Sequence, residues 1–510
     1  MKKYILIIST ILLINGFNSC SDRDLELLQP EADFITDINT ETRMQQMLSG
    51  AYFSVASADA YGSKLMIFGD ILGDKIYNTT SKANFLQTHN YNYNGLQNQF
   101  NFYGKMYEVI VSCNMVINNT SVEESPEVMR IKSEAKVLRA FAYFTLVNYY
   151  SPSPTSGINQ EYGVPLVLGN YDLSIQPARA TVKEIYTQII SDLTSGLQYV
   201  TPNPANKVIL GVNATKLLLS RVYLTRRDPG DAELALQYAT EVKDAAIAAY
   251  ANAPANQKPF ITTENITASN YANYFKGTND QLYEDHPETI WELDMSDLSN
   301  QVTGVFNDTG LPTFYSPGDK TRRSLLATKN LFDSFGTHLD VRRGGTATNP
   351  ISGLFANIVP ADEIGDTAGS GYWMSKYPRQ TNQGDASGIY LRDIKILRFS
   401  EAFLNRIEAL RLLGQEGLAL TELKAFAASR KGTTYTGANL LQDILTERSK
   451  EFYGEGQRFL DLKRYNLPVV RTTNCTVCEL QASDHRFVLP VTQAAMNSNP
   501  NLKQYQGYVN

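Results

Sequence analysis

Apolar residues recur at steps of three and four along most of the chain, a spacing typical of amphipathic helices. The clearest example covers residues 125–150, where Ser125 is a typical N-cap and Pro126 suits the first helical position. Another helix is predicted from Thr181 onward, because Thr181 and Glu184 have the spacing of a capping box. Turn-forming residues separate these segments. The pattern therefore predicts a mainly helical protein.

Two pairs of predicted helices form helical hairpins. Residues 213–227 and 231–250 are separated only by an Asp-Pro-Gly turn. Residues 398–413 and 416–431 repeat this arrangement near the C-terminus, over 34 residues in all. That length matches one tetratricopeptide unit, although the full signature of that repeat is missing. We therefore expect a short stack of helix pairs whose apolar faces pack against each other.

Residues 251–397 follow a different pattern. Turn dipeptides alternate there with short aromatic runs, such as the one around Trp291, and this predicts irregular structure with a few strands. Long inserts of this kind in compact proteins are usually functional. The expected organisation is a helical scaffold at about residues 40–250 and 398–470, with a loop-rich ligand-site insert at about residues 251–397.

The N-terminus has the features of an export signal. Lys2 and Lys3 precede a mainly apolar stretch of eleven residues, Tyr4 to Ile14, which is too short to cross a bilayer, and small residues lead to Cys20. We therefore expect residues 1–19 to be a signal peptide and residues 20–510 to form one domain. Cys20 is the expected lipidation site, and several acyl chains would anchor it firmly. The alternative is ordinary cleavage, which would leave a periplasmic protein without lipid.

The charge of the chain makes nucleic acid an unexpected partner. Loss of two lysines with residues 1–19 changes the formal charge from −6 to −8, and basic residues are interspersed with acidic ones throughout. Proteins that bind phosphate backbones need a basic stripe. No second apolar run approaches the roughly 20 residues of a membrane span. We expect a water-soluble body outside the anchor.

The remaining cysteines predict neither a disulfide scaffold nor a metal site. Cys113 lies on an apolar helix face, so it is expected to be a buried free thiol. Cys475 and Cys478 lie in a Thr-rich loop and could close a small disulfide loop. A structural zinc site needs four ligands, and only His485 is near them in sequence. No metal and no cofactor are expected.

A charge-dense stretch at residues 447–464 offers carboxylates at helical spacing, among them Glu447, Glu451 and Glu455. Groups at such spacing usually pair across a helix junction or face water. A glycoside hydrolase would need two carboxyls about 5 to 10 Å apart in one cleft, which spacing alone does not establish. We interpret the stretch as structural, expect no enzyme, and predict that Glu451→Gln and Glu455→Gln leave ligand affinity nearly intact.

Aromatic residues suggest a ligand site, with 30 tyrosines and 22 phenylalanines against two tryptophans. Sugar rings stack on aromatic planes, while their hydroxyls need amides, carboxylates or guanidinium groups. The loop from Tyr77 to Phe102 combines these residue types, and the insert could supply a second wall. The candidate ligand residues are Tyr77, His89, Tyr91, Asn92, Tyr93, Trp291, Tyr315, Tyr372 and Trp373. We expect Tyr372 and Trp373 to be exposed as a pair. For any single tyrosine, the alternative is that it packs in the core.

Several segments resemble the SusD/RagB family, whose members are nutrient-binding lipoproteins of the bacterial surface. Residues 134–150 and 163–167 resemble the long N-terminal helix of that family and its exit. Residues 447–464 are similar to its most diagnostic stretch. Residues 499–508 also fit, with Tyr505 where Asn is more usual. The resemblance covers the length of the chain.

This resemblance implies an all-α body of about four tetratricopeptide-like helix pairs, with loops and small strands that make the ligand site. It also implies a partner, a SusC-like TonB-dependent β-barrel of the outer membrane. Family members sit on such a barrel as a hinged lid, capture glycan or peptide outside the cell, and close for import. They bind without catalysis, and the early loop is one wall of their ligand site.

Our first hypothesis is therefore a lipid-anchored protein on the exterior of the outer membrane that captures an oligosaccharide and delivers it to the barrel. The second is the same role for peptides, which the small number of tryptophans favours over a broad sugar-stacking surface. A periplasmic helical-repeat scaffold for a protein partner is the third. Hydrolase activity is the fourth.

Overall fold

The computed structural model describes residues 37–509, except for residues 80–81, 171, 173, 255–257, 278–282, 296–309, 316–322, 346–353, 359–370 and 379–391. Its helices are α2 (Glu41–Ala56), α3 (Lys64–Ile71), α4 (Leu86–His89), α5 (Phe102–Ile117), α6 (Pro126–Tyr150), α7 (Val182–Gly196), α8 (Val212–Arg226), α9 (Asp231–Asn252), α10 (Ala268–Lys276), α11 (Leu311–Tyr315), α12 (Lys329–Ser334), α14 (Phe399–Leu412), α15 (Glu416–Ser429), α16 (Leu440–Glu451), α17 (Arg458–Arg464) and α18 (Gln493–Ser498). Its strands are β1 (Ile76–Asn78), β2 (Thr289–Leu293), β3 (Leu325–Thr328), β4 (Phe355–Ile358), β5 (Gly371–Met374), β6 (Ile394–Arg398), β7 (Val469–Val470) and β8 (Glu479–Leu480).

The mainly helical body with a few short strands confirms the predicted fold class. Within the described part of the chain, no helix combines the length and the apolar character that crossing a bilayer requires. The predicted signal peptide and the lipidation site at Cys20 lie outside the described residues. The division into a scaffold and a ligand-site insert stays a prediction.

Helices α6 and α7 begin where their capping residues predict. The side chain of Ser125 accepts a hydrogen bond from the Val128 amide, and Pro126 is the first helical residue of α6. Thr181 and Glu184 form a complete capping box at the start of α7. Each cap satisfies backbone amides that have no partner within the helix. These two boundaries are therefore determined by local sequence.

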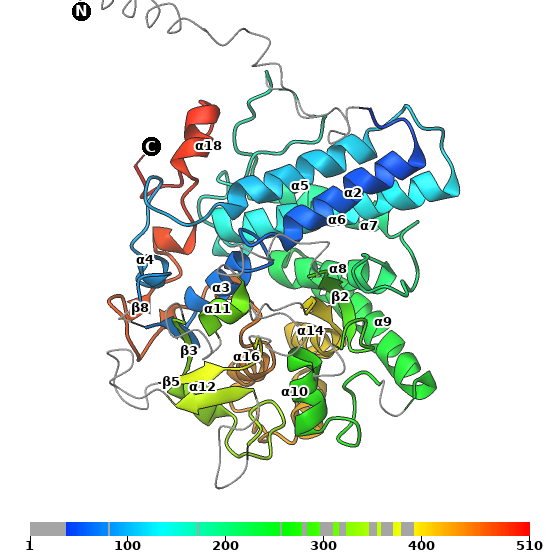
Figure 1. Cartoon of the computed structure of the whole chain (residues 1–510). Coiled ribbons are helices and arrows are strands. Elements are labelled where there is room, and N and C mark those ends of the chain that lie inside the picture. Colours follow the sequence, from blue (N-terminus) through cyan, green and yellow to red (C-terminus); the bar gives the residue numbers. More distant parts are fainter. Residues whose placement is uncertain are drawn as a thin grey trace, which may run out of the picture.

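The N-terminal helices form one packed layer. Helix α2 packs against α5 and α6, and α6 also packs against α7 (Figure 1). The apolar positions of α6, such as Ile131, Leu138 and Leu146, are fully buried. Each such side chain contributes roughly 1.5–3 kcal/mol through burial. The layer holds α2 as a rigid edge beside the strand β2.

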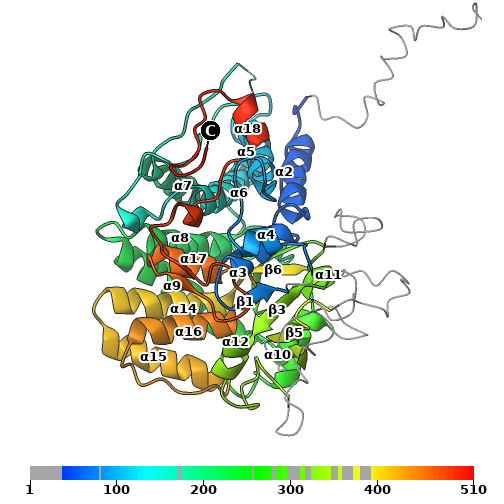
Figure 2. The ribbon, with the colours of Figure 1, turned by 90° about the vertical axis from the view of Figure 1, so that its left-hand side faces the viewer.

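Both predicted helical hairpins are confirmed. Helices α8 and α9 reverse direction through Arg227 and Gly230, which have φ values of 59° and 89°. Helices α14 and α15 form the second hairpin, and α9 packs against α14. Figure 2 shows α8, α9, α14 and α15 in successive layers. These layers make up the helical stack that the periodicity predicts.

The strands form three small antiparallel sheets. The largest has the order β1-β3-β5-β4 and pairs Ile76 with Ala327 and Ala327 with Tyr372. Strands β2 and β6 form the second sheet, with an irregular register between Thr289 and Trp291. Strands β7 and β8 form the third. The sheets therefore join segments that are far apart in the sequence.

The C-terminal segment returns to the N-terminal half of the molecule. The Leu489 amide donates to the Tyr149 carbonyl over 2.8 Å, and Lys463 donates to the Asn148 carbonyl over 2.7 Å. A disulfide joins Cys475 and Cys478 within this segment, and it settles the alternatives that the sequence leaves open for this pair. Cys113, by contrast, is a buried free thiol, as predicted.

Candidate functional site

The structure buries most of the side chains that the sequence suggests as ligand contacts. Among those nine, Asn92 is the exposed one. The buried ones are Tyr77, His89, Tyr91, Tyr93, Trp291, Tyr315, Tyr372 and Trp373. A ring that protein atoms already cover has no free face on which a sugar could stack. The ligand-binding role of these residues stays a prediction, and their packing explains their presence without a ligand.

The early loop is held by the C-terminal segment. The Tyr91 hydroxyl donates to the Leu72 carbonyl over 2.6 Å and accepts from the Arg471 guanidinium over 2.7 Å. The Tyr93 hydroxyl donates to the Arg486 carbonyl over 2.6 Å. Burial, with a smaller contribution from the Arg471 charge, lowers the pKa of His89 to about 3. These side chains therefore connect two distant parts of the fold.

Trp291 and Tyr315 belong to the core. The indole Nε1 of Trp291 donates to the Val208 carbonyl over 3.2 Å, and its ring packs edge-on against Phe141. The Tyr315 hydroxyl donates to the Asp70 carboxylate over 2.6 Å. Buried indole and phenol groups normally find such partners. The contacts of Trp291 therefore attach β2 to the scaffold, and the hydrogen bond of Tyr315 attaches α11.

The expectation that Tyr372 and Trp373 form an exposed pair is wrong. Both lie in β5, where Tyr372 is 6% exposed and Trp373 is 1% exposed. Tyr372 stacks on Phe332 with ring centres 3.8 Å apart, and the Arg323 guanidinium lies 4.9 Å from the Trp373 ring centre. The flanking glycine and serine suggest an exposed turn, but pairing of β5 between β3 and β4 overrides that local signal.

The charge-dense stretch is structural, as predicted. Arg398 donates to Glu451 over 2.6 Å and to Glu455 over 2.9 Å, while Arg342 donates to Glu447 over 2.6 Å. All five side chains are buried. Because each carboxylate is held by a guanidinium group, none is available as a free acid or base. The network instead joins α16 to β6 and to the turn that follows α12.

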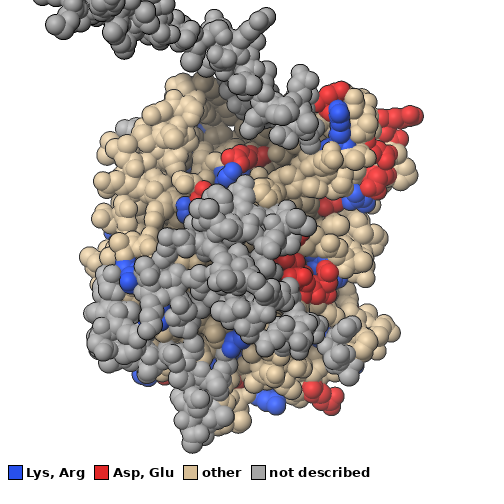
Figure 3. Space-filling view, viewed as in Figure 1, with Lys and Arg blue, Asp and Glu red and all other residues tan. Residues whose placement is uncertain are grey.

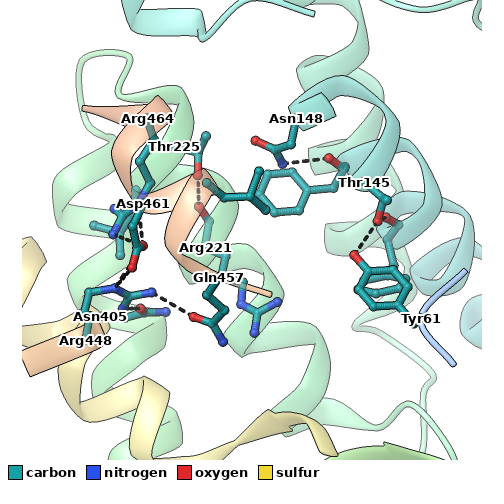
Figure 4. Close-up of a pocket in the computed structure, with 14 residues that line it drawn as sticks. Tyr61, Thr145, Asn148, Arg221, Thr225, Asn405, Arg448, Gln457, Asp461 and Arg464 are labelled. Atoms are coloured by element: carbon teal, nitrogen blue, oxygen red, sulfur yellow. Dashed lines mark hydrogen bonds and ion pairs between the residues drawn. The ribbon is translucent and has the colours of Figure 1, made fainter. Parts of the chain in front are cut away.

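A hollow of about 70 Å³ lies between α6, α8, α14 and α17, and charged and polar side chains line much of it (Figure 4). Arg448 pairs with Asp461 over 2.9 Å and donates to the Asn405 side chain over 3.0 Å. The hydroxyls of Tyr61 and Thr145 lie 2.8 Å apart. These groups satisfy one another, and the volume holds only a few water molecules. We therefore interpret this hollow as part of the scaffold.

A larger pocket of about 490 Å³ lies between α2 and the end of β2, and we refer to it as the α2–β2 pocket. Small-molecule sites in proteins usually have volumes of about 300–1,000 Å³. Two partly buried rings, Tyr52 and Phe53, lie beside polar groups in its wall. The polar lining residues are Gln45, Ser49, Glu134, Glu292 and Asp294. The pocket thus combines the two residue types that a sugar requires.

Hydrogen bonds fix the wall of the α2–β2 pocket. The Tyr52 hydroxyl donates to Glu134 over 2.6 Å and accepts from the Leu210 amide over 3.1 Å. Arg130 donates to Glu134 over 2.6 Å and to the Gln45 side chain over 2.7 Å. Burial raises the pKa of Glu134, and the Tyr52 and Arg130 contacts oppose that rise. The polar groups are therefore held in place before any ligand arrives.

The α2–β2 pocket has an acidic end. No Lys or Arg is among the described residues that line it. Lys395 contacts the Glu292 carboxylate from behind over 3.2 Å. Burial raises the pKa of the neighbouring Asp393 to about 8, and the Glu292 charge adds to the rise. The described lining therefore offers an anionic ligand no cationic partner, whereas a neutral hydroxyl could donate to the carboxylate oxygens.

Sequence reasoning missed the α2–β2 pocket. On α2, Gln45, Ser49 and Phe53 recur at steps of four, which places them on one face of the helix. That spacing is typical of many helix surfaces, so it does not single these residues out. The end of β2 comes to face them only through tertiary packing of β2 beside α2.

Comparisons with known proteins agree with this architecture. A family model described as "Starch-binding associating with outer membrane" matches residues 25–224, and the SusD family model matches residues 346–508. The chain belongs to the SusD/RagB family. A SusD-like protein of Bacteroides ovatus is 25% identical over 91% of this chain and 82% of its own length.

Two further SusD relatives illustrate the range of similarity. The starch-binding protein SusD of Bacteroides thetaiotaomicron is 30% identical, over 23% of this chain and 22% of its own length. The crystal structure of a SusD-like carbohydrate-binding protein of Bacteroides vulgatus has a TM-score of 0.72 and 20% identity, and it covers 93% of this chain and 99% of that one. At that identity the structural likeness shows the shared SusD fold.

Proposed function

We propose that this chain captures a neutral oligosaccharide at the cell surface and delivers it to a SusC-like TonB-dependent barrel of the outer membrane. Family membership supports this role, because the matching model is described as starch-binding and associated with the outer membrane. Relatives are named as starch-binding and carbohydrate-binding proteins. The proposal assigns binding and transfer to the chain, without catalysis.

The single observation that carries the ligand class is the composition of the α2–β2 pocket. Its rings can stack on the apolar face of a sugar, and its carboxylates and amide can accept and donate hydrogen bonds around the rim. Its acidic end disfavours uronic acids and sulfated sugars. We therefore propose a neutral glycan as the ligand, and a peptide with a free carboxylate would be a poorer match.

A calorimetric titration with neutral oligosaccharides tests the assignment of the pocket. Phe53→Ala removes a ring from the wall, and we expect affinity to fall by more than about 1 kcal/mol, the usual scale of stacking losses. Gly50→Trp should abolish binding, because Gly50 lines the pocket and has no atom within 4 Å of an added Cβ.

Matched controls separate loss of the pocket from loss of the fold. Gln46→Ala changes an exposed residue of the same helix, and Gly417→Trp adds an indole at an open position of α15. Both should bind like the wild-type chain. Unchanged affinity of well-folded Phe53→Ala and Gly50→Trp proteins would remove the α2–β2 pocket from the proposal. If acidic peptides bind more strongly than neutral glycans, the proposed ligand is a peptide and the glycan assignment is wrong.

The transport role needs its own experiments. We propose lipid on Cys20, exposure at the cell exterior and a barrel partner, and gentle detergent extraction followed by affinity capture should co-purify that barrel. Protease treatment of intact cells should cleave the chain. Protection from the protease, or capture without any outer-membrane barrel, would favour the periplasmic scaffold. Steady release of reducing sugar by purified protein would restore the hydrolase hypothesis.

A further inference from the structure

An apolar groove of about 660 Å³ lies at the α18 end of the molecule, apart from the α2–β2 pocket. Its floor is the first half of α5. One wall is formed by residues 165–170 with Asp172, Ile175 and Pro177, and the other by α18 with the residues up to Leu502. Figures 1 and 2 both show α18 beside α5. We name this feature the α5–α18 groove.

Hydrogen bonds from both sides hold the loop that forms its wall. Asn114 of α5 donates to the carbonyls of Val167 and Gly169 over 3.0 and 2.9 Å. On the other side, Asn499 donates to the Pro177 carbonyl over 2.8 Å, and Asn501 donates to the Gln176 carbonyl over 2.8 Å. The α5–α18 groove is therefore preformed.

The lining of the groove is apolar and leaves room for an occupant. Among the described residues that line it, Asp172 is the charged one. Gly104 and Gly169 have no atom within 4 Å of an added Cβ, and Ile175 is 59% exposed. In Figure 3 the surface over α18 and the adjoining end of α5 is nearly free of charged side chains. An exposed apolar hollow of this size is typical of an interaction site.

The N-terminal segment joins the fold next to this groove. Asn119 donates to the Ile38 carbonyl over 2.7 Å, and the preceding residue, Asn118, donates to the Leu168 carbonyl of the groove wall over 2.8 Å. Residues 21–37 can span about 56 Å when extended. The distance along α5 from Asn119 back to Tyr103 is about 24 Å. The segment that precedes Ile38 can therefore reach every part of the groove.

We propose that residues 25–35 of this chain dock in the α5–α18 groove. The segment is rich in apolar residues, with Leu25, Leu27 and Leu28 at its start and Phe34 and Ile35 at its end. The family model match also starts at residue 25, which places this segment within the matched part of the chain. Docking buries apolar side chains of the segment in a charge-poor hollow.

Docking changes how the domain is held, a consequence that depends on the proposed lipid anchor at Cys20. With residues 25–35 bound, only about five residues separate the acyl chains from the groove, a span of about 17 Å. Without docking, the span is about 56 Å up to Ile38. Docking therefore holds the α18 end of the domain close to the membrane.

Hydrogen exchange on the mature chain, produced as a Cys20→Ser protein without lipid, tests the docking itself. We expect the amides of residues 25–35 to exchange at least about tenfold more slowly than in a free peptide of the same sequence. Gly104→Trp fills the groove and should return them to the free-peptide rate. Gly417→Trp adds the same side chain at an open position of α15 and should leave the protection unchanged.

Free-peptide exchange of residues 25–35 in the wild-type chain would overturn the proposal. Protection that survives in a well-folded Gly104→Trp protein would overturn it as well, because the segment would then bind elsewhere. Protection of the groove that depends on protein concentration, without protection of residues 25–35, would instead assign the groove to a second copy of the chain. Because the protein carries no lipid, these results do not depend on glycan binding or on the anchor.

Discussion

Glu451→Gln should destabilise the fold strongly while leaving its shape nearly unchanged. Glu451 is fully buried and accepts hydrogen bonds from Arg398 over 2.6 Å, Arg342 over 3.3 Å and Arg430 over 3.4 Å. Glutamine keeps the volume and removes the charge. The positive charges then lose part of their compensation inside the protein. Removing one partner of a buried ion pair typically costs about 3–5 kcal/mol.

The structure suggests the lower end of that range, because other acids remain in the network. Arg398 keeps Glu455 and Arg342 keeps Glu447 as partners. We therefore expect a loss of about 3 kcal/mol in the free energy of unfolding at pH 7. With a denaturant dependence of about 3 kcal/mol per molar urea, the unfolding midpoint should fall by about 1 M.

The pH dependence gives a second test of the same prediction. Burial alone would raise the pKa of Glu451, but Arg430, Arg398 and Arg342 lower it well below its ordinary value. A carboxyl with a lowered pKa stabilises the fold above its unfolded-state pKa of about 4.5, and this contribution is lost as the pH falls. The difference between wild type and Glu451→Gln should therefore shrink between pH 5 and pH 3.

Urea unfolding followed by circular dichroism at several pH values measures both effects. The exposed Glu123 is the control, and Glu123→Gln should change stability by less than about 0.5 kcal/mol. Glycan affinity of folded Glu451→Gln should stay within error of wild type. A loss below about 1 kcal/mol at pH 7, or a difference that does not depend on pH, would refute the assigned role of the network.

Three further predictions concern the buried aromatic residues and the disulfide. Trp373→Ala should lower stability by about 3–5 kcal/mol in thermal or urea unfolding, and a loss of affinity without a loss of stability would contradict its core position. Tyr91→Phe should cost about 1–3 kcal/mol, because the Arg471 donor and the Leu72 carbonyl both lose the hydroxyl; an unchanged melting curve would contradict this. Replacing Cys475 and Cys478 with serine should cost about 2 kcal/mol and increase local hydrogen exchange, and uniform exchange would count against a local effect.

Sequence alone predicts the parts of this fold that depend on neighbouring residues. The caps at Ser125 and Thr181 define helix starts, because the groups that bond there lie within three residues of each other. The exposure of aromatic rings could not be predicted in the same way. Tyr91 is covered by Arg471 and Tyr93 by the backbone of Arg486, partners that lie about 380 to 390 positions away.

The α2–β2 pocket could not be predicted from the sequence either, because tertiary packing forms it. Phe53 and Gln45 occupy ordinary positions on a helix surface, and nothing in their spacing predicts a facing strand end. The prediction that Tyr372 and Trp373 are exposed failed because it used only local sequence, in which Gly371 and Ser370 suggest a turn. Strand pairing on both sides placed Trp373 in the interior instead.

The return of the C-terminal segment has a consequence for how the protein is made. Arg471, Arg486 and Leu489 contact residues near positions 71, 93 and 149. The N-terminal half therefore lacks these partners until almost the whole chain has been made. Contacts between distant positions form slowly, and incomplete chains expose apolar surface. The incomplete polypeptide should therefore need protection from proteases and from aggregation until its last forty residues can join the fold.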